Sequence, residues 1–94
     1  MNEMDFRCGL HTMSLSRKVV SDLVSRVKRV ERVLGIDIDE EYEKDKCKRV
    51  MNFFIGGVNV EQEWGIEVGE IRTRTYKYAV VKYINVKDLM ELER

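Results

Sequence analysis

Two cysteines and one histidine are the residues in this chain that most readily bind a metal ion. Cys8 and His11 form a C-x-x-H pair, and Cys47 lies far along the sequence. A structural zinc site needs four ligands, and the chain has no further cysteine or histidine to complete the set. We therefore expect no metal site, and we expect Cys47 to be a small buried hydrophobic residue.

An acidic run could suggest a calcium loop, but its details do not fit. The segment from Asp37 to Asp45 holds six acidic residues and one lysine. A calcium loop also needs a central Gly and a bidentate Glu at its twelfth position, and both are missing here. We interpret the run as the solvated start of a helix, with Asp37 or Asp39 as the N-cap.

Enzymatic chemistry has little support in the sequence. Gly56-Gly57 is too short for a phosphate-binding loop, and no Gly-Lys-Ser/Thr follows it. The single histidine cannot be assigned to a catalytic triad without a placed nucleophile and acid. We expect that the chain is not an enzyme and uses no cofactor.

The most informative segment is SRKVVSDLVSRVKRVERVLGIDIDEE, from Ser16 to Glu41. At 100° per residue, one side of a helix from Arg17 to Leu34 is apolar, with Glu31 near its margin. The apolar side consists of Val19, Val20, Leu23, Val24, Val27, Val30 and Leu34. The opposite side, which we call the basic face, consists of Arg17, Lys18, Ser21, Ser25, Lys28, Arg29 and Arg32.

Charge on this helix is segregated, whereas an ordinary solvated helix intersperses acids and bases. From Arg17 to Arg32 there are six basic and two acidic residues, and Asp22 lies only at the edge of the basic face. Cations and serine hydroxyls are the groups that contact DNA phosphates. The basic face therefore predicts contact with double-stranded DNA, although a solvated surface helix is the alternative. A later segment adds three fainter candidates, Arg74, Tyr78 and Lys82.

Composition limits the class of protein. The chain has 94 residues, net charge zero and 44% hydrophobic residues, as expected for one small domain, 1–94, with a modest core. Two cysteines, no signal peptide and no long apolar run predict a cytoplasmic protein without a membrane span. Thirteen valines, a single glutamine and many charges are typical of a thermophilic source, although the absence of proline points the other way.

Periodicity predicts a mainly α fold, a bundle of four or five helices. Residues 1–13 form either a short helix that packs through Met4, Phe6, Leu10 and Met13, or a loosely attached end. A helix follows Ser16, with Ser14 as a rival N-cap and Gly35 as the C-terminal stop. The next helix has one apolar face and ends before Gly56. That face consists of Cys47, Val50, Met51 and Phe54.

The last segment is the least clear. Its β-branched and aromatic content favours a strand, but its spacing places Tyr76, Ala79, Val80, Tyr83 and Ile84 on one helical face, and we predict a helix. Leu89 to Leu92 then form a short tail helix. The alternative is an α+β fold with an antiparallel sheet from 58–68 and 76–86, acting as a protein–protein interaction or dimerisation module of plasmid or viral type. Trp64 is expected to anchor the core.

The order of these features resembles a known family. SLSRKVVSDLVSRVKRVERVLGIDID and IRTRTYKYAVVKYINV look like the opening and closing helices of the SAM-like N-terminal, core-binding domain of tyrosine recombinases and phage-type integrases. Val19 stands where that family usually has Thr, and residues 56–70 do not fit the pattern. The resemblance implies a non-catalytic helical bundle that clamps a duplex through its backbone. It is also compatible with a recombinase as a protein partner, and a homodimer is a separate alternative.

Overall fold

The computed structural model describes residues 1–55, 71 and 73–92, and these contain five helices and no strand. The helices are α1 (Glu3–Thr12), α2 (Arg17–Leu34), α3 (Ile38–Asp45), α4 (Lys48–Ile55) and α6 (Arg74–Leu92). The prediction of a small helical bundle is confirmed. Because residues 76–86 are helical, they do not form the strand of the α+β alternative. The other predicted strand, 58–68, and Trp64 and Gly56-Gly57 lie outside the described residues.

The ends of α2 follow from its sequence. The Ser16 side chain accepts a hydrogen bond from the Val19 amide, as an N-cap does, at 3.2 Å. Gly35 ends the helix in the left-handed conformation, with φ at 65°, where a side chain is disfavoured. Ser14 is not the cap. It turns the chain between α1 and α2 with a φ of 65°.

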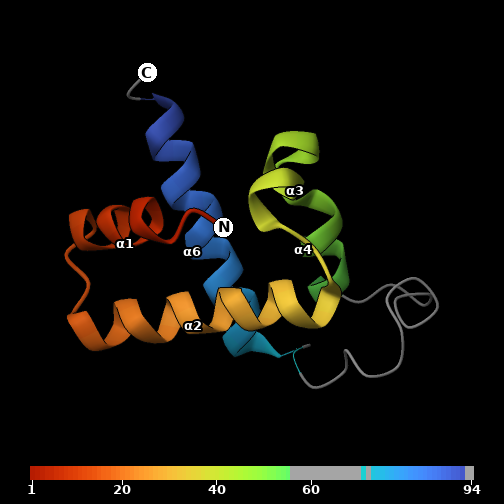
Figure 1. The fold of residues 1–94 in the computed structure, drawn as a ribbon, viewed down its shortest axis with the longest axis horizontal. Helices are drawn as coiled ribbons and strands as arrows, with labels where there is room; N and C mark the ends of the chain where they lie inside the picture. Colours follow the sequence, from red (N-terminus) through yellow and green to blue (C-terminus); the bar gives the residue numbers. More distant parts are fainter. Residues whose placement is uncertain (56–70, 72, 93–94) are drawn as a thin grey trace.

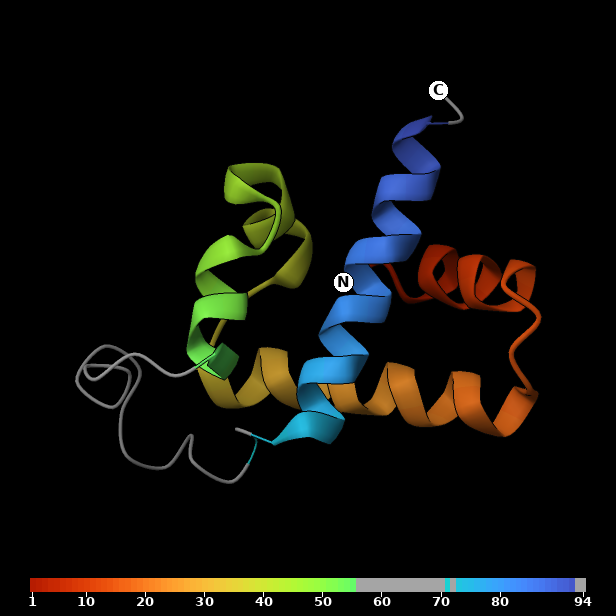
Figure 2. The ribbon, with the colours of Figure 1, turned by 180° about the vertical axis from the view of Figure 1, so that it is seen from behind.

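The helices are arranged around α6. Figure 1 shows α2 along one edge of the molecule, with α1 folded back beside it and the α3–α4 pair at the other end. The last helix packs against α1, α2 and α4, and the view from behind in Figure 2 shows it crossing α2. Helices distant in the sequence are therefore joined through α6.

The core consists of the apolar sides predicted for the long helices. Val20, Leu23, Val24, Val27 and Val30 of α2 are buried. They meet Phe6 and Leu10 of α1, Val50 and Phe53 of α4, and Ala79, Val80, Tyr83 and Val86 of α6. Two expectations were wrong: Met4 is 75% exposed and Val19 is 38% exposed. Met4 points away from Phe6, because two residues turn a helix by about 200°.

The segment expected to form one helix after Asp37 forms two. Asp37 caps α3 by accepting a hydrogen bond from the Asp39 amide. Lys46 and Cys47 then both adopt positive φ, 56° and 63°, which interrupts the helix. Asp45 accepts hydrogen bonds from the Lys48 and Arg49 amides and so starts α4. The turn inserts a bend, and Cys47 is fully buried as predicted.

Candidate nucleic-acid interface

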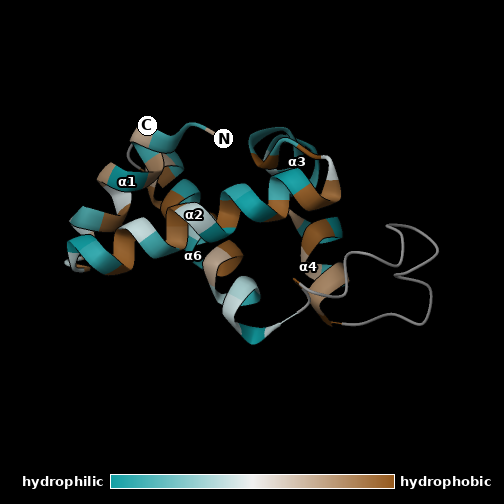
Figure 3. Cartoon of the chain, turned by 60° about the horizontal axis from the view of Figure 1, so that its bottom comes forward, coloured by the Kyte–Doolittle hydropathy of each residue, from teal (hydrophilic) through white to brown (hydrophobic). Residues whose placement is uncertain are grey.

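The basic face of α2 lies on the outside of the molecule. Arg17, Lys18, Ser25, Lys28 and Arg32 are exposed, and Ser21 and Arg29 are partly buried. Figure 3 shows α2 running across this side of the molecule, with its hydrophilic residues in teal. The four exposed cations of the face, Arg17, Lys18, Lys28 and Arg32, are not covered by a neighbouring helix, because the valines turn the opposite side of α2 inward.

Two cations of the face are held by neighbouring helices. The Lys28 ammonium forms an ion pair with the Glu3 carboxylate of α1. The Arg29 guanidinium donates a hydrogen bond of 2.9 Å to the Tyr76 hydroxyl of α6 and lies 5.6 Å from the centre of that ring. These contacts fix the two flanks of the face, because α1 lies beside Lys28 and the first turn of α6 lies beside Arg29.

The other cations have no such constraint. Among the described residues, Arg17, Lys18 and Arg32 form no ion pair, and all three are exposed. Asp22 is partly buried at the edge of the face, as the helical projection predicts. The face therefore presents two cations at its N-terminal end, one at its C-terminal end and the Ser25 hydroxyl between them to an anionic surface.

The three additional candidates for DNA contact, from the last helix, lie on another surface. Arg74 and Tyr78 are exposed, and Lys82 is partly buried with its ammonium 5.4 Å from the centre of the Tyr78 ring. Tyr76 faces Arg29, and two residues turn a helix by about 200°, so Tyr78 points away from α2. The structure does not bring Tyr78 and Lys82 together with the basic face.

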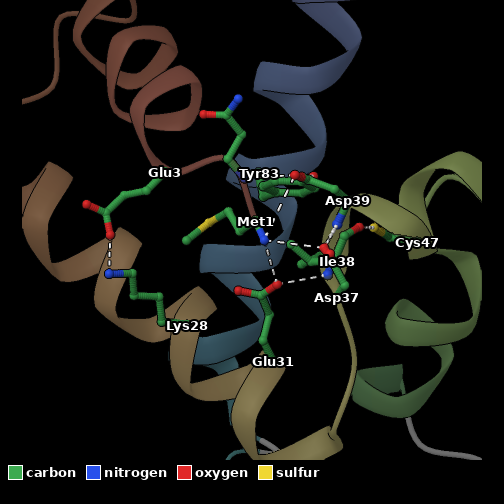
Figure 4. A network of polar contacts seen from close by, with 10 residues as sticks. Met1, Glu3, Lys28, Glu31, Asp37, Ile38, Asp39, Cys47 and Tyr83 are labelled. Atoms are coloured by element: carbon green, nitrogen blue, oxygen red, sulfur yellow. Dashed lines mark hydrogen bonds and ion pairs between the residues drawn. The ribbon is translucent and has the colours of Figure 1, made fainter.

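Glu31, at the margin of the apolar side, belongs to a polar network that sequence reasoning missed. Its carboxylate accepts hydrogen bonds from the Met1 amine and the Ile38 amide, both at 3.0 Å. The amine also lies 3.3 Å from Asp37 and 3.9 Å from Asp39. Figure 4 shows these groups converging where α1, α2, α3 and α6 meet, with the Tyr83 hydroxyl donating to Asp39.

Burial and charge shift the protonation of this network. Burial lowers the pKa of the Met1 amine, but the hydrogen bond and charge of Glu31, with Asp37 and Asp39, outweigh it, so the pKa lies above its ordinary 8.0. Burial and the hydrogen bond to Asp39 raise the pKa of Tyr83. The amine and Tyr83 therefore stay protonated and hold the carboxylates together. The network stabilises the fold by joining the N-terminus to α2, α3 and α6. No periodic pattern in the sequence predicts it, because its residues are brought together only by tertiary contacts.

The acidic run has structural partners within the chain. Asp37, Asp39 and Asp45 accept hydrogen bonds from backbone amides, and buried Glu41 lies 3.5 Å from the Arg49 guanidinium. No group of three or more Cys, His, Asp or Glu side chains within 1–55, 71 and 73–92 is placed to hold a metal. Burial raises the pKa of the Cys47 thiol to about 12, so this thiol is a poor metal ligand as well as a packed one.

No family model, curated protein or solved structure matches this chain. The similarity to the recombinase core-binding domain thus remains a resemblance of sequence pattern. Among the helices of the described residues, none is both long and apolar enough to cross a membrane. Among the described residues, the basic face of α2 concentrates exposed cations on one side of a helix.

Proposed function

We propose that this chain binds double-stranded DNA, and that the basic face of α2 contacts the phosphate backbone. The observation that carries the proposal is the row of exposed cations on one side of α2, with apolar residues on the other. Each cation that neutralises a phosphate releases a condensed counterion, and this release drives binding.

The dimensions of the face suit a duplex. Arg17 and Arg32 are fifteen residues apart, which is about 22 Å along a helix axis. A duplex carries one charge per roughly 1.7 Å of its axis, so a face of this length meets several phosphates. Because α1 and α6 flank α2, they limit how deeply α2 can enter a groove. We therefore propose contact along the backbone.

Sequence specificity is expected to be weak. Bases are read in the major groove chiefly by Arg, Lys, Asn and Gln side chains that form bidentate hydrogen bonds. The basic face carries no Asn or Gln, and Arg29 is already bonded to Tyr76. Its serines are suited to phosphate oxygens. We propose a non-catalytic, backbone-binding role, in keeping with the resemblance to the recombinase core-binding domain, and a cytoplasmic location in which both cysteines stay as free thiols.

The test is a salt titration of binding to a random-sequence duplex. The variant Arg17→Gln/Lys18→Gln/Arg32→Gln removes the cations that form no ion pair among the described residues and leaves the Lys28 and Arg29 contacts intact. Three lost phosphate contacts should reduce the slope of log K against log salt by about 2.7, since each contributes roughly 0.9. The melting temperature should hardly change, because these side chains are exposed.

The matched control is Lys44→Gln/Lys46→Gln/Lys48→Gln. It removes the same charge from exposed residues at the α3–α4 turn, and Figure 2 shows this turn on the far side of the molecule from α2. It should retain the wild-type slope. If the wild type shows no binding at low salt, or if both variants lose the same slope, the basic face of α2 is not the binding surface.

A further inference from the structure

One carboxylate beside the basic face bridges two cations that come from different helices. The Glu3 side chain of α1 forms an ion pair with Lys28 of α2 through one oxygen. Its other oxygen lies 3.2 Å from Nε of Arg7, which is one turn further along α1. All three side chains are accessible, with exposed fractions of 36% for Glu3, 38% for Arg7 and 57% for Lys28. Figure 4 shows Glu3 reaching from α1 to Lys28, so the carboxylate holds Arg7 close to the basic face.

The packing of α1 against α2 sets where Arg7 lies along this face. Figure 1 shows α1 folded back beside α2, so residue numbers rise in opposite directions along the two helices. Starting from the contact of Glu3 with Lys28, four residues forward along α1 correspond to about four residues back along α2. Arg7 therefore lies beside the turn of α2 that contains Ser25. Between Lys18 and Lys28 the basic face has serines and no cation, and Arg7 adds one there.

The Glu3 carboxylate is charged at neutral pH but does not hold its partners strongly. Hydrogen bonds from Lys28 and from Arg7 keep the pKa of Glu3 below its ordinary 4.5. Ion pairs between accessible side chains are weak, because water and salt screen them and because ordering two long side chains costs entropy. A phosphate can therefore take either cation away from Glu3. The negative charge of Glu3 then remains beside the phosphate and opposes the contact.

We propose that Arg7 contacts the DNA backbone together with Lys28, and that Glu3 between them weakens this contact. The inference rests on the proposed function and extends the interface from α2 to α1. Arg7, Lys28 and Glu3 together carry one net positive charge, whereas Glu3→Gln leaves two. Each phosphate that is neutralised contributes roughly 0.9 to the slope of log K against log salt, so Glu3→Gln should steepen the slope by about 0.9.

Salt titrations of Glu3→Gln with a random-sequence duplex test the effect of the carboxylate. A slope steeper by about 0.9 means that the affinity of Glu3→Gln relative to wild type rises about eightfold for each tenfold fall in salt. The matched control is Asp5→Asn, which removes an acid from the same first turn of α1. Two residues turn a helix by about 200°, so Asp5 faces away from Lys28. The control should keep the slope of wild type.

The contact of Arg7 is tested in the Glu3→Gln background, where the carboxylate no longer occupies its guanidinium. Adding Arg7→Gln should lower the slope by about 0.9. Adding Lys44→Gln, which removes an exposed cation of α3, should leave the slope unchanged. Circular dichroism melts should show that all these chains fold as wild type does, because none of the changed side chains is buried. Equal slopes for the Arg7 and Lys44 variants would show that Arg7 does not contact DNA.

The outcomes separate this inference from the proposed function. If wild type binds with a steep salt slope and Glu3→Gln has the same slope as Asp5→Asn, the inference is overturned and the basic face of α2 stays the binding surface. Weaker binding by Glu3→Gln also overturns it, because Glu3 would then position Lys28 for DNA. A wild type that does not bind at low salt overturns both.

Discussion

The contact between Gly9 of α1 and Val86 of α6 gives a quantitative test of how the helices pack. A Cβ atom added to Gly9 would lie within contact distance of Val86 Cγ1, and would be 3.1 Å and 3.2 Å from Cγ2 and Cβ of the same residue. Val86 is only 1% exposed and its β-branched side chain has one preferred rotamer in a helix, so it cannot turn aside. Gly9→Ala should therefore push α1 away from α6.

Two effects oppose each other in this variant. Alanine is a better helix former than glycine by about 0.8–1.0 kcal/mol, which favours Gly9→Ala. Overpacking a well-filled contact costs about 1–3 kcal/mol. The clash involves the branched part of Val86 and not a flexible side-chain end, so we place the steric cost in the upper part of that range, about 2–3 kcal/mol. The net destabilisation should then be about 1–2 kcal/mol. For a domain of this size, each kcal/mol lowers the melting temperature by about 4–8 °C.

Urea denaturation followed by circular dichroism measures the free energy of unfolding of wild type, Gly9→Ala, Val86→Ala and the double variant. Val86→Ala alone should cost about 1–3 kcal/mol through the cavity it leaves. In that background Gly9→Ala should be neutral or stabilising, because the obstacle is gone and the propensity gain remains. A double-mutant cycle with no coupling, or a Gly9→Ala chain as stable as wild type, would refute the close α1–α6 contact.

Two further predictions concern protonation and thiol reactivity. The Met1 amine has a raised pKa in the folded state, so its contribution to stability is complete below pH 8 and is lost as the pH rises through the folded value. Glu31→Gln should therefore lose less stability than wild type between pH 7 and pH 10 in urea titrations, and an equal loss would show that the amine does not depend on Glu31. The Cys47 thiol is fully buried and burial raises its pKa to about 12, while Cys8 is exposed. A thiol reagent at pH 8 should modify one cysteine rapidly in the native chain and two after unfolding, and rapid modification of both would contradict the burial of Cys47.

The sequence was sufficient to predict features set by local rules. The valine and leucine spacing, the Ser16 cap and the Gly35 stop determined α2, and the projection placed its cations outside. In α6 the helical spacing of the apolar residues also outweighed their intrinsic preference for strands. The free energy that aromatic and β-branched side chains gain by packing in the core is larger than the difference between their helix and strand propensities. These features depend on neighbours in sequence, which a helical projection describes well.

Features set by tertiary contacts could not be predicted in this way. Neither Lys46 nor Cys47 is a residue type that favours positive φ, so the break between α3 and α4 had no direct signal. Asp45 was the available clue, since an acid at that point can cap a new helix. The contacts of Lys28 with Glu3 and of Arg29 with Tyr76 depend on how α1 and α6 lie across α2.

The central position of α6 has a consequence for biosynthesis. The helices α1, α2 and α4 all pack against this one element, which is the last of the described helices to leave the ribosome. Until residues 74–92 emerge, the apolar sides of the earlier helices have no common surface to cover them. Folding of the described region therefore waits until α6 has left the ribosome, and a nascent chain that stalls before Arg74 presents those sides to chaperones and proteases.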